Sequence, residues 1–312
     1  MSKLSEKTLA TYKSIVNSIY RNIGLGKSAP VDDAKWIPKH FKQIVDYIDN
    51  LDSVHTQKNN YAVMKTWCNM FDVDDEKIIK TLDERMSDLA ESVNASYATN
   101  KMNEKIEKNW VGVEQMKEKV EYLKSKLPDV NAIDTYREYI QLMKYLCLLI
   151  HIEVPLRNDL ADAKLVKELP ADQDDEVNYL VIKKNMVSLH LNNYKTRKEY
   201  GAKVIQFSKE LSRIIIYYSE TINRMSPHGW FISKNNEDAQ ISRPTYTKMI
   251  NSIFSKDGVK VGSTQIRRAV VSDLYNVSED EMKKKQELAN VMSHSVATAG
   301  LVYAKHIPDS KK

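Results

Sequence analysis

The sequence predicts a mainly α-helical protein that contains one small antiparallel β-sheet and is divided into two domains. Its 312 residues include only eight glycines and eight prolines, which favours long helices over turns. A chain of this length forms two domains more often than one. Three β-rich runs in the second half, NYLVIKK, MVSLHLNN and AKVIQFS, predict the strands of the sheet.

The first hundred residues predict a bundle of four short helices. Apolar residues between Leu9 and Tyr20 recur at three- and four-residue spacing, which is typical of one face of a helix. Further helices are expected at about 35–51, 53–71 and 74–93. The segment ASYATNKMNEKIEKN then loses this periodicity. It is interpreted as a linker near 95–109, with a solvated extension of the fourth helix as the alternative.

The second domain is predicted to combine helices with the small sheet. The stretch AIDTYREYIQLMKYLCLLIHI is apolar almost all round, which indicates a buried central helix. After the strands, helical patterns resume at SKELSRIIIYYSETINR. Ser263 is expected to cap a later helix, and Ser278 with Glu281 has the spacing of a capping box. Domains are therefore placed at 1–100 and 108–312.

Charge is distributed unevenly along the chain. From Lys195 onward there are 20 lysines and arginines against 12 acidic residues, a net charge of +8, whereas the preceding part carries −3. A basic segment of this kind fits nucleic acid as partner, and a solvated lysine-rich surface is the open alternative. Cys68 and Cys147 lie in apolar helical patterns and are expected to be reduced. With no membrane span or signal peptide in the pattern, an intracellular protein without membrane contact is expected.

Five residues stand out as candidates for chemistry. Arg157 lies in EVPLRNDLADAKL, Lys195 in the turn NNYKTRKEYG, and Arg267 in GSTQIRRAVV. His294 precedes Tyr303 by nine residues in SHSVATAGLVYAKH. Taken singly, each has an ordinary explanation as a surface ion, a solvated turn or a packed side chain.

Together and in this order, these residues resemble the catalytic set of the tyrosine recombinase (phage integrase) family. The resemblance covers essentially the whole chain, is strongest over 152–306, and is greatest to integrases of virophages and giant DNA viruses. It implies an N-terminal helical core-binding domain of SAM-like fold that clamps DNA, followed by an α+β catalytic domain. It further implies site-specific recombination, such as viral genome integration, by a homotetramer on paired double-stranded DNA sites. The protein alone would be a monomer or dimer, in the cytoplasm or nucleus of a host or in a virion.

The resemblance also implies a role for each candidate residue. Arg157 and Arg267 would hold the scissile phosphate, because planar guanidinium groups bind its oxygens in pairs and keep their charge. Tyr303 would attack the phosphorus and form a 3′-phosphotyrosyl bond, while Lys195 protonates the leaving 5′-oxygen. His294 would hydrogen-bond the phosphate or help to deprotonate the tyrosine. No metal, metal ligand or ATP is required, so no cofactor is expected.

Three supporting positions differ from the family pattern or leave a choice open. Thr264 stands where the family usually has histidine or lysine, and threonine is no proton-transfer base at neutral pH. The usual acidic position is Leu160, and Asp159 beside it is the expected substitute. Arg268 adjoins Arg267, so either arginine could face the phosphate, with the alignment favouring Arg267.

Several basic residues are candidate DNA contacts, and their alternative is a solvated surface. They are Lys3, Lys7, Lys13, Arg21, Lys39, Lys42, Arg197, Lys198 and Arg243. Other functions also remain open at this point. One is a type IB topoisomerase or telomere resolvase with the same catalytic groups. Another is a catalytically silent DNA-binding protein on the same fold, and a third is a helical protein with no nucleic-acid role.

Overall fold

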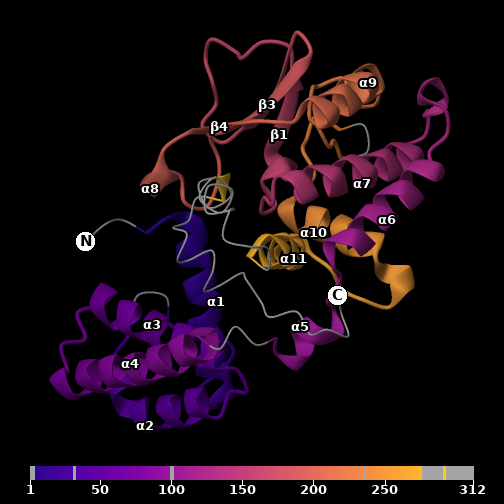
Figure 1. The fold of residues 1–312 in the computed structure, drawn as a ribbon. Coiled ribbons are helices and arrows are strands. Elements are labelled where there is room, and N and C mark those ends of the chain that lie inside the picture. Colours follow the sequence, from indigo (N-terminus) through magenta and orange to yellow (C-terminus); the bar gives the residue numbers. More distant parts are fainter. Residues whose placement is uncertain (1–3, 31–32, 99–101, 235–236, 276–290, 293–312) are drawn as a thin grey trace. The chain divides into compact units, whose positions relative to one another are not determined.

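The computed structural model describes residues 4–30, 33–98, 102–234, 237–275 and 291–292 (Figure 1). The chain divides into two compact units, Met1–Thr99 and Asn100–Lys312. The roles of the two units, as DNA clamp and catalytic domain, stay predictions. Within the described ranges, no helix is long and apolar enough to cross a membrane.

In its described residues, 4–30 and 33–98, the N-terminal unit has four helices, as the apolar periodicity predicted. They are α1 (Glu6–Asn22), α2 (Trp36–Asp49), α3 (Val54–Met70) and α4 (Glu76–Ala98). Side chains of Ser5 and Ser53 cap α1 and α3 by accepting a backbone N–H from the first turn. Buried residues from all four helices, among them Ile37 and Trp67, form the core of this unit.

The C-terminal unit surrounds a small sheet with helices. Its helices are α5 (Glu104–Lys108), α6 (Val113–Ser125), η1 (Val130–Ala132), α7 (Tyr136–Glu153), η2 (Asp159–Asp162), α8 (Arg197–Tyr200), α9 (Lys209–Met225), α10 (Arg243–Ile253), η3 (Ser255–Asp257) and α11 (Ser263–Tyr275). Helix α7 is the buried central helix that the sequence predicted, and it packs against α6, α9, α10 and α11. Thr135 and Glu138 form a capping box that starts it.

The sheet has four strands in the order β1–β2–β3–β4 (Figure 1). They are β1 (Ala163–Val166), β2 (Asn178–Lys183), β3 (Met186–Leu191) and β4 (Lys203–Gln206). The three predicted strands are β2 to β4, and they are antiparallel, as expected. Leu180, Leu189 and Ile205 are aligned across them and join the main core, because alternate residues of a strand face the same side.

Strand β1 was not predicted, and it pairs with β2 in parallel. It has only four residues, AKLV, which is too short for an alternating pattern to be recognised. The sheet is therefore mixed rather than wholly antiparallel. Because β1 follows η2 directly, it places the end of the Arg157 segment at one edge of the sheet.

The linker expected near 95–109 is largely helical. Helix α4 continues to Ala98, and Asn103 caps the short helix α5 by accepting the N–H of Ile106. Ile106 and Trp110 are buried in the core of the C-terminal unit. In the part of this segment from 102 onward, the polar residues are mostly exposed, and Ile106 anchors α5.

Candidate active site

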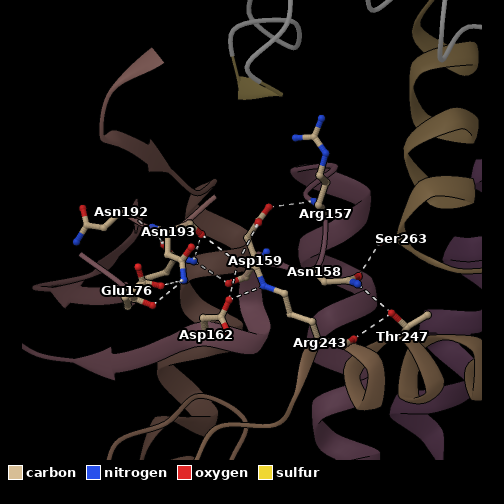
Figure 2. A network of polar contacts seen from close by, with 11 residues as sticks. Arg157, Asn158, Asp159, Asp162, Glu176, Asn192, Asn193, Arg243, Thr247 and Ser263 are labelled. Atoms are coloured by element: carbon tan, nitrogen blue, oxygen red, sulfur yellow. Dashed lines mark hydrogen bonds and ion pairs between the residues drawn. The ribbon is translucent and has the colours of Figure 1, made fainter. Parts of the chain in front are cut away.

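The Arg157 segment follows directly on the end of α7. The N–H of Val154 bonds to the carbonyl of Ile150, and the chain then passes through buried Pro155 and Leu156. The backbone N–H of Arg157 donates to Asp159 Oδ2 at 3.2 Å. In Figure 2 the Arg157 guanidinium points away from this carboxylate, so the half-buried side chain is directed out of the loop.

Lys195 lies in the connection between β3 and β4, where the sequence placed it. Its side chain is exposed, and in the described chain it forms no ion pair or hydrogen bond. Tyr194 is buried, and its hydroxyl donates to the carbonyl of Gly201 at 2.7 Å, which ties one end of the turn to the other. The backbone of this turn therefore sets where the ammonium group can reach.

Arg267 lies on α11 and faces the Arg157 segment. Its Nη1 donates to the carbonyl of Pro155 at 2.8 Å, and the side chain is only 2% exposed. Arg268, by contrast, donates to Gln265 on its own helix. Of the two adjacent arginines, it is therefore Arg267 that contacts the segment containing Arg157.

Thr264 and Ser263 begin α11. Thr264 is exposed in the first turn. Ser263 was expected to cap this helix, but it is the first residue of α11, and its hydroxyl donates to Asn158 Oδ1 at 2.9 Å. The hydroxyl thus joins α11 to the loop of Arg157 instead of bonding to a backbone N–H of its own helix.

Two asparagine side chains, Asn158 and Asn178, join the three segments that carry Arg157, Lys195 and Arg267. Figure 2 shows the contacts of Asn158 with Ser263 and Thr247. Asn158 accepts from Ser263 on α11 and donates to Thr247 Oγ1 on α10 at 2.9 Å. Asn178 donates to the backbone carbonyls of Asp159 and Asn193 at 2.9 and 3.0 Å. It also accepts the N–H groups of Asn192 and Asn193, at 2.9 and 2.8 Å.

Arg243, at the start of α10, adds an ionic link to this network. Its Nε and Nη2 lie 2.7 and 2.6 Å from Asp162 Oδ2, and Nη2 also donates to the carbonyl of Asn193. Asp159 Oδ1 lies 4.0 Å from the same Nη2. The sequence offered Arg243 as a DNA contact. In the structure its charge is matched by a buried carboxylate at the edge of the sheet.

Two buried groups near the arginines have shifted pKa values, mainly because of burial. Burial raises the pKa of Asp159 above its ordinary value, while Arg243, Arg157 and Arg267 act in the opposite direction. Burial, and to a smaller extent the positive charge of Arg267, lower the pKa of His151 from 6.5 to about 3. Both groups are thus within the electrostatic reach of Arg267, and the supporting role of Asp159 beside Arg157 stays a prediction.

The two remaining catalytic candidates, His294 and Tyr303, lie outside the described residues, as do Lys3 and the side chain of Lys7. The capping pair Ser278 and Glu281 also lies outside them. Other candidate DNA contacts are placed on the two units. Those that are exposed are Arg21, Lys39, Lys42 and Lys198, whereas Lys13 and Arg197 are half-buried. Arg197 Nη2 lies 3.9 Å from Asp175 Oδ1.

The sequence did not single out Asn158, Asn178 or Asp162. Asn158 and Asp162 stand inside the motif PLRNDLADAKL, so proximity to Arg157 was an available signal. Asn178 had one weaker signal, a polar residue at the start of a β-rich run. Among the described residues, no group of three or more histidine, cysteine or acidic side chains is placed to hold a metal ion.

Comparison with known proteins found distant structural likeness. No family model matches the chain, and no curated protein matches it. The crystal structure of XerA recombinase is similar over 99% of this chain and 90% of its own, with a TM-score of 0.42 and 14% identity. The XerH site-specific recombinase bound to difH substrate, in a pre-cleavage complex, is similar over 96% of this chain and 94% of its own. Its TM-score is 0.45 and its identity 8%.

Proposed function

We propose that this protein is a site-specific DNA recombinase that cuts and rejoins DNA through a tyrosine nucleophile. The observation that carries the proposal is the joining of three cationic segments, far apart in sequence, by one hydrogen-bond network. Arg157 follows α7, Lys195 lies in the β3–β4 turn and Arg267 lies on α11. These are the three cations, in order, that the resemblance to tyrosine recombinases requires.

In the proposed reaction the two arginines bind the non-bridging oxygens of the scissile phosphate. Their guanidinium groups offset the charge that develops on the pentavalent transition state. Tyr303 Oη loses its proton to His294 or to water and attacks the phosphorus, the P–O5′ bond breaks, and a 3′-phosphotyrosyl ester forms. Lys195 gives a proton to the departing 5′-oxygen. Because Arg267 is 2% exposed in this structure, the proposal requires its guanidinium to become accessible when DNA binds.

The wider biology follows as part of the same proposal. The N-terminal helical unit would grip the DNA, and four protomers would assemble on paired sites. The chain would serve integration of a viral genome, in line with its resemblance to integrases of virophages and giant DNA viruses. A type IB topoisomerase would use the same groups as a monomer, so relaxation of supercoils without paired sites would favour that alternative.

The experiment that tests the proposal is covalent trapping. The protein is mixed, without metal or ATP, with a pool of nicked duplexes that carry candidate and random sequences. A denaturing gel then reports protein with attached DNA. We expect an adduct from the wild type and from Tyr217→Phe, which changes a tyrosine on α9 that is 61% exposed. Tyr303→Phe should give none, although it still binds DNA in a salt-dependent manner.

An adduct from Tyr303→Phe would contradict the proposal. Absence of any adduct from the wild type, with salt-dependent binding to the same pool, would instead favour a silent DNA-binding protein. Thr264 is the residue that favours this second candidate, because the family's usual proton-transfer side chain is missing at its exposed position. Thr264→His would then be tested for recovery of the adduct.

A further inference from the structure

Asn178 uses the whole hydrogen-bonding capacity of its side chain. It is the first residue of β2, fully buried, and bonds to two segments that are not its own. Its two amide hydrogens go to the carbonyls of Asp159 and Asn193, and its oxygen accepts from Asn192 and Asn193. A carboxamide can make at most two donations and two acceptances, and here all four are made.

No other side chain of this size could replace it. Aspartate has no hydrogens to give to the two carbonyls, and leucine has neither donor nor acceptor. The next residues of β2, Tyr179, Leu180 and Val181, are buried too and are mostly apolar, as is usual for a strand in a core. A polar amide at this buried position costs free energy unless its bonds are made, so its presence indicates a task in holding loops.

The loop that it holds carries Lys195. Asn193 is bonded to Asn178 through both its N–H and its carbonyl, and Lys195 follows two residues later. In the described part of the chain the Lys195 side chain forms no ion pair or hydrogen bond, so only the backbone positions it. The same amide donates a hydrogen bond to the backbone carbonyl of Asp159, two residues after Arg157. Asn178 therefore sets the distance between the turn of Lys195 and the loop of Arg157.

We propose that Asn178 is a positioning residue that holds Lys195 where it can protonate the leaving 5′-oxygen. The inference rests on the proposed function, since it assigns Asn178 a share in the same proton transfer. Asn158 is its counterpart on the other side of the Arg157 loop. Through Ser263 it holds the helix of Arg267, and it makes no bond to the turn of Lys195.

Two nicked duplexes that differ in one atom at the scissile phosphate separate these roles. In one the 5′-bridging atom is oxygen, and in the other it is sulfur. Tyrosine attack breaks a P–O bond in the first and a P–S bond in the second. An alkoxide needs a proton as it leaves, whereas a thiolate is stable enough to leave without one. Only the oxygen substrate therefore depends on the general acid.

We expect Asn178→Ala to slow adduct formation about 100-fold on the oxygen substrate, the cost of displacing a catalytic group by about 1 Å. On the sulfur substrate its rate should stay within about tenfold of the wild type, because general acid catalysis contributes about 100-fold or more and is no longer needed. Lys195→Ala should show the same pattern. Asn158→Ala should slow both substrates by the same factor, because it acts on phosphate binding through Arg267.

The sulfur substrate also reports folding, because an unfolded variant would fail on both duplexes. If the alanine variant does not fold, Asn178→Ser provides a neutral second variant, whose single hydroxyl can make at most one of the two donated bonds. Equal slowing of either foldable Asn178 variant on both substrates would overturn the positioning role and leave the recombinase proposal standing. No adduct from the wild type on either duplex would overturn both.

Discussion

His151 provides a direct test of how tightly the end of α7 is packed beneath the candidate site. The side chain is fully buried, and its Nε2 lies 2.7 Å from the hydroxyl of Tyr246 on α10. Burial, and then the charge of Arg267, lower the pKa of His151 from 6.5 to about 3. The imidazole is therefore neutral in the folded protein at all but strongly acidic pH. In the unfolded chain the imidazole would take up a proton near its reference pKa of 6.5.

The sign and size of the effect follow from linkage. Because the pKa of His151 is lowered in the folded state, its contribution to the free energy of unfolding is fully present above pH 6.5 and is lost as the pH drops toward about 3. Each pKa unit between the folded and the unfolded state corresponds to about 1.4 kcal/mol in the free energy of unfolding. At about pH 5, protonation of this residue in the unfolded state lowers the free energy of unfolding by about 2 kcal/mol. Below about pH 3 the loss is complete and amounts to about 5 kcal/mol.

The measurement is urea unfolding of the full chain at about pH 7.5 and about pH 5. His151→Gln removes the titrating group and leaves an amide that can still reach the Tyr246 hydroxyl. Both proteins lose stability in acid, but we expect the wild type to lose about 2 kcal/mol more than the variant. Titration of all other groups cancels in this difference. Equal losses would show that His151 titrates normally, and the packing of α7, α10 and α11 described above would then be wrong.

Two further substitutions test the elements that support the site. The N-cap of α7 is Thr135, and its hydroxyl accepts the N–H of Glu138 at 3.2 Å. Thr135→Ala removes this bond and should lower the free energy of unfolding by about 1 kcal/mol, and Thr135→Ser should restore it. Tyr139→Phe removes the 2.8 Å hydrogen bond that the tyrosine hydroxyl donates to the buried carbonyl of Phe231, and should lower the free energy of unfolding by about 1–3 kcal/mol. The control Tyr217→Phe, at an exposed position, should not change the free energy of unfolding measurably. Urea unfolding measures both, and an unchanged midpoint for Tyr139→Phe would contradict the buried bond.

Elements with a strong local pattern were predicted closely. The helix expected at 35–51 is α2 (Trp36–Asp49), and the one expected at 53–71 is α3 (Val54–Met70). One apolar face per helix is enough to define such elements, because neighbouring turns repeat the signal. The three antiparallel strands were found for a similar reason, since each combines β-branched residues with a flanking turn.

Elements that depend on distant partners were missed. Strand β1 has four residues and owes its conformation to pairing with β2 and to a bond from Leu165 N–H to the carbonyl of Gly229. No periodicity within AKLV carries that information. Helix α5 was taken as linker because Ile106 is its single buried residue. In both cases tertiary contacts, and not local propensity, decide the structure.

The candidate site shows the same division. Arg157, Lys195 and Arg267 were selected because their order and surroundings resemble a family pattern, and the described structure places them on segments joined by one network. His294 and Tyr303 stay predictions. The asparagines that join the segments follow no spacing rule, because their partners are brought near only by the fold: side-chain hydroxyls of α10 and α11 for Asn158, and backbone groups of two loops for Asn178. The structure is therefore needed to show which buried polar groups such residues bond to.

The choice of neutral amides for this network has an electrostatic reason. A carboxylate in place of either amide would add a negative charge to the loops that carry Arg157 and Lys195, where it would compete with a phosphate for these cations. A carboxamide fixes the same distances and leaves the positive charge available. The one close ion pair in Figure 2, between Arg243 and Asp162, involves an arginine outside the proposed phosphate-binding pair. Under the proposed function, neutral amides would hold the loops together without adding further negative charge beside the phosphate.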